Sequence, residues 1–149
     1  MARPSMQLVA ALRSTAARLA GGAAYQWGHF GQCNCGHLAQ TVCKLDKRVI
    51  HEWALEGAGD WEQLANDYCP TSGHHIDDVI GALLEVGLDR DDLGHLEKVD
   101  DPAVLARLGW YPARNVREDV VAYLRAWADL LEAQLPEVAE VTPLAAVAA

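Results

Sequence analysis

An apolar stripe along residues 116–135 constrains the fold of this chain more than any other feature of its sequence. Its apolar side chains recur at steps of three or four residues: Val116, Val120, Leu124, Trp127, Leu131 and Leu135. This spacing places them on one face of a helix, and such a face has to be buried against other helices. The sequence therefore predicts a long helix, ended by Pro136, that packs into a helical core.

Shorter segments with helix signals precede this stripe. Side chains suited to cap a helix start stand at several points: Ser5, Asp46, Asp60, Thr71 or Ser72, Asp101 and Asn115. The expected helices cover about residues 6–20, 37–45, 46–56, 61–68, 72–86, 89–99 and 102–108, and the second and third of these can join into one. We therefore expect an all-α chain, with six or seven unequal helices in one compact domain over residues 1–135 and a loosely ordered tail over residues 136–149.

Length and charge narrow the functions that the chain can have. With 149 residues, it can bury a core without disulfide bonds. The net charge of −9 is unevenly distributed, since residues 1–48 carry a net +5 and residues 49–149 a net −14. Because an acidic body repels phosphate, we expect no nucleic-acid partner. No run of about 18 apolar residues occurs, so we expect no membrane-spanning segment.

The first residues raise the question of an export signal. Arg13 and Arg18 interrupt the apolar segment that begins at Leu8, whereas a secretory signal keeps such a segment free of charge. The same segment suits an amphipathic helix that packs on the rest of the protein. We therefore expect a cytoplasmic protein, in which cysteines stay reduced.

Two irregular segments hold most of the cysteine and histidine side chains that could bind a metal ion or react. The first, GHFGQCNCGHLAQ at residues 28–40, is a Gly-rich loop with two thiols one residue apart and a histidine soon after them. The second, CPTSG at residues 69–73, begins with a lone cysteine. Loops of this kind can bend their thiols around a metal ion, and a helix that starts nearby favours the thiolate form.

These groups predict a zinc site that joins the two segments. Cys33, Cys35 and Cys69 would supply three ligands, and either His37 or His51 would supply the fourth. Thiolates with an imidazole suit zinc and make no redox demand. A structural or regulatory role fits better than a catalytic one, because no motif places an acid or base beside an open coordination position. Whether the chain catalyses any reaction stays open at this point.

Three other interpretations compete with zinc. An iron–sulfur cluster would recruit all four cysteines, although Cys43 lies on a candidate apolar helix face and suits the core. A metal-free redox protein would cycle Cys33 and Cys35 between dithiol and disulfide, with Cys69 as the resolving thiol. A helical interaction module would hold the cysteines merely as packing groups, and two copies could pair through the C-terminal helix as a homo-oligomer.

Overall fold

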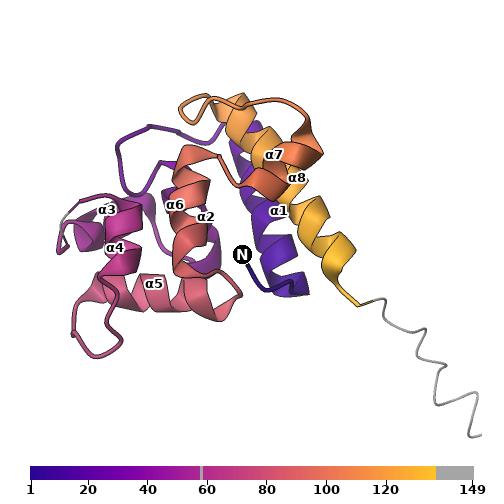
Figure 1. Cartoon of the computed structure of the whole chain (residues 1–149). Coiled ribbons are helices and arrows are strands. Elements are labelled where there is room, and N and C mark those ends of the chain that lie inside the picture. Colours follow the sequence, from indigo (N-terminus) through magenta and orange to yellow (C-terminus); the bar gives the residue numbers. More distant parts are fainter. Residues whose placement is uncertain (58, 137–149) are drawn as a thin grey trace, which may run out of the picture.

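The computed structural model describes residues 1–57 and 59–136, and all regular structure in these ranges is helical (Figure 1). Its eight helices are α1 (Met6–Ala20), α2 (Asn34–Cys43), α3 (Lys47–Ala54), α4 (Trp61–Asn66), α5 (His75–Glu85), α6 (Arg90–Lys98), α7 (Pro102–Leu108) and α8 (Arg117–Gln134). The predicted all-α class is confirmed, with eight helices in place of six or seven. Of the predicted tail, residues 137–149 lie outside the described residues.

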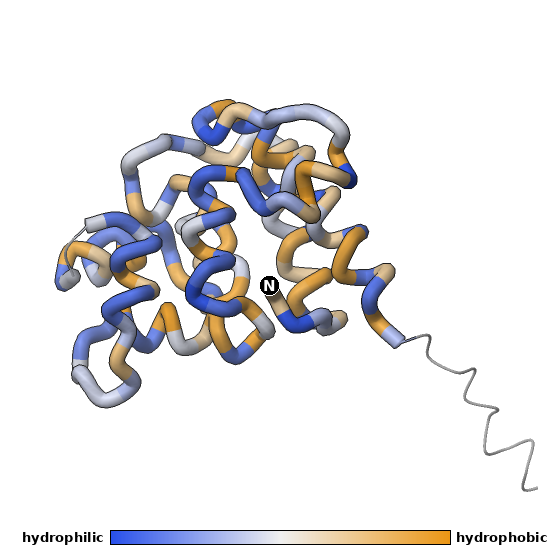
Figure 2. The backbone as a smooth tube through the Cα atoms, in the orientation of Figure 1, coloured by the Kyte–Doolittle hydropathy of each residue, from blue (hydrophilic) through white to orange (hydrophobic). Residues whose placement is uncertain are grey.

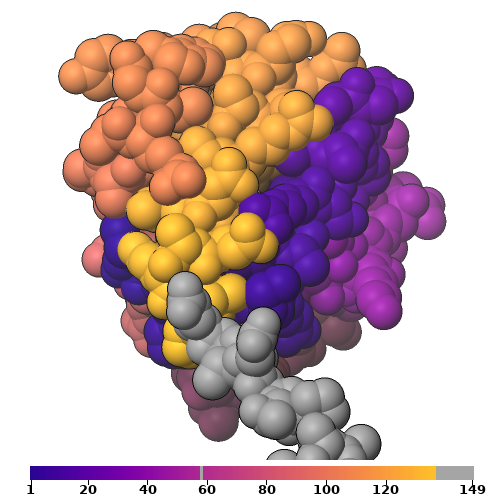
Figure 3. All heavy atoms as spheres, turned by 90° about the vertical axis from the view of Figure 1, so that its right-hand side faces the viewer, coloured from indigo at the N-terminus to yellow at the C-terminus, as the bar shows by residue number. Residues whose placement is uncertain are grey.

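The helices fall into two groups that share one core. In Figure 1, α1 and α8 lie side by side with α7 against α8, and α3, α4, α5 and α6 lie on the other side. The space-filling view in Figure 3 shows α8 lying along α1 at the surface of the molecule. Helix α2 connects the groups, because it packs against α1, α3, α5 and α6.

The predicted stripe of the last helix is buried in its middle, whereas its two end members, Val116 and Leu135, lie outside the helix and are not buried. Leu124, Trp127 and Leu131 are buried in α8, and this helix packs chiefly against α1. Figure 2 shows hydrophobic residues on α1 and α8 where the two helices lie beside each other, whereas α6 shows mostly hydrophilic residues in that view. Pairing of two copies through α8 stays a prediction. Between residues 1 and 136, apart from residue 58, no helix has both the length and the apolar character needed to cross a bilayer.

Side-chain caps confirm several of the predicted helix starts. The backbone N–H of Leu8 donates to Ser5 Oγ at 3.0 Å, and the N–H of Gln63 donates to Asp60 Oδ1 at 2.9 Å. Asp46 accepts from the N–H of Arg48 at 2.7 Å in the same way. Each cap satisfies one of the amides that a helix start leaves without an intrahelical partner.

Other predicted boundaries were wrong, for local backbone reasons. Helix α2 begins at Asn34, three residues before the predicted start. Lys44 adopts a left-handed conformation with φ 55° and ends α2, so α2 and α3 are two helices, as predicted, and the alternative of one joined helix is wrong. Helix α5 begins after His74, without a side-chain cap from Thr71 or Ser72. The expected cap at Asn115 is also absent, because Val116 precedes α8 and no side chain caps it.

Truncation of a core residue in α1 tests this packing. Leu12 is fully buried, so we expect Leu12→Ala to lower the free energy of unfolding by about 2 to 5 kcal/mol. Met6 lies on the same helix but is 58% exposed, and Met6→Ala should change the stability by less than about 0.5 kcal/mol. Urea denaturation followed by circular dichroism measures both values. Equal effects of the two changes would contradict the buried position of Leu12.

Candidate functional site

The start of α2 and the end of α6 hold each other through side-chain caps. Asn34, the first residue of α2, is fully buried between the two loop cysteines. Its Nδ2 lies 3.1 Å from the backbone oxygens of Leu96, Glu97 and Arg114, so it donates to carbonyls at the end of α6 and in the segment before α8. The Tyr25 hydroxyl, 2.6 Å from Asn34 Oδ1, fixes the other end of the amide.

Glu97 from α6 in turn caps the start of α2. Cys33 occupies the cap position of α2 but makes no side-chain cap. The N–H of Cys35 instead donates to Glu97 Oε1 at 2.6 Å, so a carboxylate from another helix satisfies the first turn of α2. Burial raises the pKa of Glu97, the hydrogen bonds from Cys35 and Cys33 oppose that rise, and the nearby Asp60 carboxylate adds to it.

The two loop thiols are packed inside the protein. Cys33 accepts a hydrogen bond from Trp61 Nε1 at 3.2 Å, and Cys35 donates to the backbone oxygen of Leu93 at 3.1 Å. Burial raises the pKa of both thiols far above the ordinary value, and the Glu97 carboxylate raises it further. Both thiols are therefore harder to ionise than an exposed cysteine, which makes them poor nucleophiles in the folded protein.

A pocket of about 410 Å³ opens beside this junction, and we call it the aromatic–carboxylate pocket. It is lined by Trp27, Gly28, Phe30, Cys33, Gly59, Asp60, Trp61 and Glu97. The Phe30 and Trp61 rings meet edge to face, with their centroids 6.2 Å apart. A different pocket of about 480 Å³, next to Trp110 and Tyr111 after α7, has no carboxylate or basic side chain in its lining. The aromatic–carboxylate pocket therefore offers both apolar surface and charge.

The wall of this pocket is held by a stacked pair of imidazoles. The His29 and His51 rings stack with their centroids 3.9 Å apart. His51 Nδ1 accepts the N–H of Phe30 at 3.2 Å, and His29 Nδ1 accepts the N–H of Gly31 at 3.1 Å. Gly31 approaches α3 so closely that a Cβ atom there would overlap the backbone oxygen of Lys47. His51 is thus a structural anchor of the loop that carries Phe30.

His37, the other predicted ligand, is buried in a separate set of contacts. Its Nε2 donates to the backbone oxygen of Ala24 at 2.7 Å, and its Nδ1 lies 3.2 Å from the guanidinium of Arg18. Both ring nitrogens are therefore engaged with protein groups. Burial lowers the pKa of His37 to about 4, so the ring is neutral at physiological pH.

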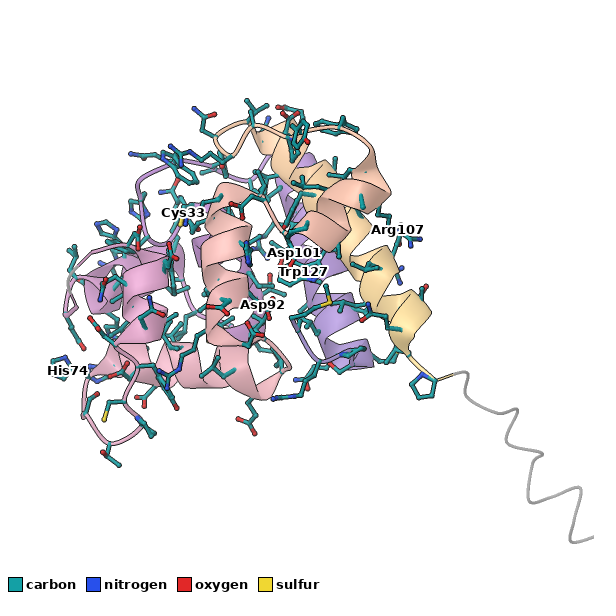
Figure 4. All side chains as sticks on the ribbon, in the orientation of Figure 1. Cys33, His74, Asp92, Asp101, Arg107 and Trp127 are labelled. Atoms are coloured by element: carbon teal, nitrogen blue, oxygen red, sulfur yellow. The ribbon has the colours of Figure 1, made fainter. Side chains whose placement is uncertain are left out.

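Cys69 lies apart from the other two predicted thiols. It follows the end of α4, it is exposed, and its sulfur lies 3.5 Å from the Thr71 hydroxyl, which lowers the pKa of the Cys69 thiol. Cys33 contacts Trp61 at the start of α4, and a helix of six residues is roughly 9 Å long. Figure 4 shows Cys33 near one end of α6 and His74, just after the Cys69 segment, on the far side of α4.

Cys33 and Cys35 thus both contact Glu97, whereas Cys69, His37 and His51 each have other hydrogen-bond partners. Over residues 1–57 and 59–136, no group of three or more His, Cys, Asp or Glu side chains has the arrangement of a metal site. Zinc binding gains no support from this geometry and stays a prediction, which metal analysis of purified protein tests. The iron–sulfur and dithiol hypotheses also stay predictions. Cys43 lies at the far end of α2, half-buried against the core, as expected of a packing group.

The sequence reasoning missed the residues that shape the pocket, above all Glu97 and Asn34. A usable signal existed for Glu97, because it follows Leu93 by four residues and therefore lies on the apolar face of its helix. A carboxylate on such a face predicts a buried acid with a specific partner. For Asn34 no comparable signal exists, since its partners come from α6 and from Arg114.

Comparisons of the chain with protein families, with characterised proteins and with solved structures found no match. No function can therefore be transferred from a relative. What the protein does has to be argued from the aromatic–carboxylate pocket and its surroundings, by the chemistry that its lining can recognise.

Alkylation of the folded protein tests the placement of the thiols. We expect iodoacetamide at pH 8 to modify the exposed Cys69 rapidly, because its thiol pKa is lowered, and to leave Cys33 and Cys35 unmodified until the protein unfolds. Peptide mass spectrometry at successive times measures the order. Modification of Cys33 or Cys35 as fast as Cys69 would show that the loop thiols are accessible and reactive.

The pH dependence of stability tests the buried state of His37. An unfolded histidine titrates near pH 6.5 and the folded one at about 4, so the unfolded chain binds more protons in between. His37 therefore contributes stability that is complete above pH 6.5 and falls by about 3 kcal/mol as the pH drops to 4. In His37→Gln, whose amide can still donate to Ala24, the loss between pH 7 and pH 4 should be smaller by about that amount. Equal losses in urea denaturation of the two proteins would contradict this assignment.

Proposed function

We propose that this protein binds a small organic ammonium ion in the aromatic–carboxylate pocket. One observation carries the proposal: three aromatic side chains and two carboxylates converge on a volume of about 410 Å³. This volume falls in the range of small-molecule sites, in which a largely apolar wall is combined with a few placed polar groups. The described residues that line the pocket include no lysine or arginine, and the arginine described against the lining is Arg114, which lies over Trp27.

The aromatic lining suits a cation with apolar substituents. The face of an indole or phenyl ring carries partial negative charge and attracts a cation within about 6 Å of its centroid. Trp27, Phe30 and Trp61 line the pocket from two different parts of the chain, with Trp27 the most exposed of the three. Methyl groups on an ammonium nitrogen bury apolar area against these rings and spread the charge over a larger ion. The lining thus resembles, in its chemistry, the aromatic cages that bind quaternary ammonium groups.

The carboxylates give the pocket its preference for positive charge. Glu97 is held in place by the Cys35 amide, and Asp60 is fixed as the cap of α4, so neither needs to reorganise when a ligand enters. Asp60 raises the pKa of Glu97, which means that the two negative charges repel each other. A cation between them relieves that repulsion and stabilises the ionised form of Glu97.

Binding fits this geometry better than catalysis does. Cys33, the nucleophilic residue type in the lining, is a neutral thiol because burial and Glu97 raise its pKa. The histidines nearest to it along the chain, His29 and His37, use ring nitrogens in hydrogen bonds to the loop backbone. A carboxylate that caps a helix is well suited to hold a charge and poorly placed to move a proton.

Isothermal titration with choline tests the proposal. We expect saturable binding of choline at neutral pH and at least about tenfold weaker binding of 3,3-dimethyl-1-butanol, its neutral isostere, a difference of about 1.4 kcal/mol. The comparison keeps shape and apolar area while it removes the charge. Equal affinities for the two compounds would show that the pocket recognises only apolar volume, and binding of neither would overturn the proposed function.

Variants of the lining assign the binding to this pocket. In Glu97→Gln the amide oxygen can still accept from Cys35, so the fold is retained while the charge is lost, and we expect choline affinity to fall about tenfold or more. Trp27→Ala should weaken binding by about 0.5 to 2 kcal/mol. The matched control is Trp110→Ala, an exposed tryptophan that lines a different pocket, and it should bind choline as the unmodified protein does.

A further inference from the structure

Arg114 lies at the edge of the aromatic–carboxylate pocket without lining it. Its Cζ is 5.3 Å from the centroid of the Trp27 ring, so the guanidinium stacks over an indole that forms part of the pocket wall. The position is fixed from the backbone, because the carbonyl oxygen of Arg114 accepts from Asn34 Nδ2 at 3.1 Å and lies 2.9 Å from the Tyr25 hydroxyl. The helix junction that holds Glu97 therefore also holds Arg114.

The guanidinium of Arg114 keeps its hydrogen-bond donors available. The contact of a guanidinium with an aromatic face uses none of its five N–H groups, so these can still donate to a ligand. Arg114 is exposed, and it forms no ion pair with any residue in the described ranges 1–57 and 59–136. An arginine in this state matches the geometry of a phosphate or carboxylate, which it can bind with two parallel hydrogen bonds.

From this arrangement we propose that the natural ligand is zwitterionic, with an ammonium group in the pocket and a phosphate or carboxylate on Arg114. The inference rests on the proposed function, since it takes the pocket as the ammonium site. An ammonium group within about 6 Å of the Trp27 centroid lies at most roughly 11 Å from Arg114 Cζ, and the acidic group lies one hydrogen bond beyond the guanidinium. A short aliphatic spacer between an ammonium and an acidic group satisfies that limit.

The charges around the pocket explain why a ligand with both a positive and a negative group should bind more tightly than a ligand with one charge. Glu97 and Asp60 line the pocket and repel a free anion, so Arg114 alone is a weak anion site. Arg114 in turn repels a simple cation that approaches Trp27, which lowers the affinity for an ammonium ion without an acidic tail. A zwitterion turns both repulsions into attractions, and the site thereby discriminates against singly charged compounds.

Titration of phosphocholine, glycine betaine and choline into the protein and into Arg114→Gln tests this inference. In the unmodified protein we expect at least one of the two zwitterions to bind about tenfold tighter than choline or better. In Arg114→Gln that ratio should fall to about one, while choline binds equally well or more tightly. The preferred zwitterion identifies the acidic group as phosphate or carboxylate. Arg107→Gln is the control, because Arg107 is an exposed arginine on α7, away from Cys33 in Figure 4, and it should keep the ratio unchanged.

The outcomes separate this inference from the proposed function. If choline binds but neither zwitterion binds more tightly, the ammonium site stands and the role of Arg114 as an anion subsite is wrong. If Arg114→Gln keeps the preference for the zwitterion, another group holds the acidic tail and the inference is again wrong. If none of the three compounds binds, the proposed function falls and this inference falls with it. Circular dichroism of Arg114→Gln checks the fold, which depends on the Arg114 backbone rather than on its side chain.

Discussion

The reciprocal capping between α2 and α6 is the interaction on which the rest of this structure depends. Asn34 satisfies carbonyl groups at the end of α6, and Glu97 satisfies an amide at the start of α2. Each of these polar groups would cost about 1 to 3 kcal/mol if it were buried without a partner, so the two helix ends have to meet. Because α2 contacts four other helices, the junction also fixes how the α1 and α8 side of the molecule meets the α3 to α6 side.

The pocket and the two loop cysteines follow from that junction. Cys33 and Cys35 flank Asn34 in the sequence, so they enter the interior together with it and serve as small packing groups. The glycines that flank them allow close backbone contact, as at Gly36, where a Cβ atom would overlap the Phe30 backbone. A loop that is drawn in at Asn34 and anchored by His29 and His51 leaves Trp27 and Phe30 around a hollow next to Glu97.

The sequence predicted the helices but not the contacts at the junction of α2 and α6, because helix signals are local and these contacts are not. Helical periodicity and caps such as Ser5 and Asp60 involve residues three or four apart, so they can be recognised in the amino-acid sequence itself. The partners of Asn34 and Cys35 lie about 60 to 80 residues away, and nothing in the local pattern identifies them. Cys69 was predicted as a partner for Cys33 from its residue type, and the structure describes it as an exposed thiol beside Thr71, after the end of α4.

The pocket draws its lining from three separate stretches of chain, around Phe30, around Asp60 and at Glu97, with Arg114 beside it from a fourth. None of these stretches can form a fragment of the cavity alone, so the cavity exists only in the cooperatively folded state. By thermodynamic linkage, any compound that binds only the folded cavity stabilises the folded state by an amount that grows with the ratio of its free concentration to its Kd. Ligand binding in this pocket would in this way be coupled to the stability of the whole domain.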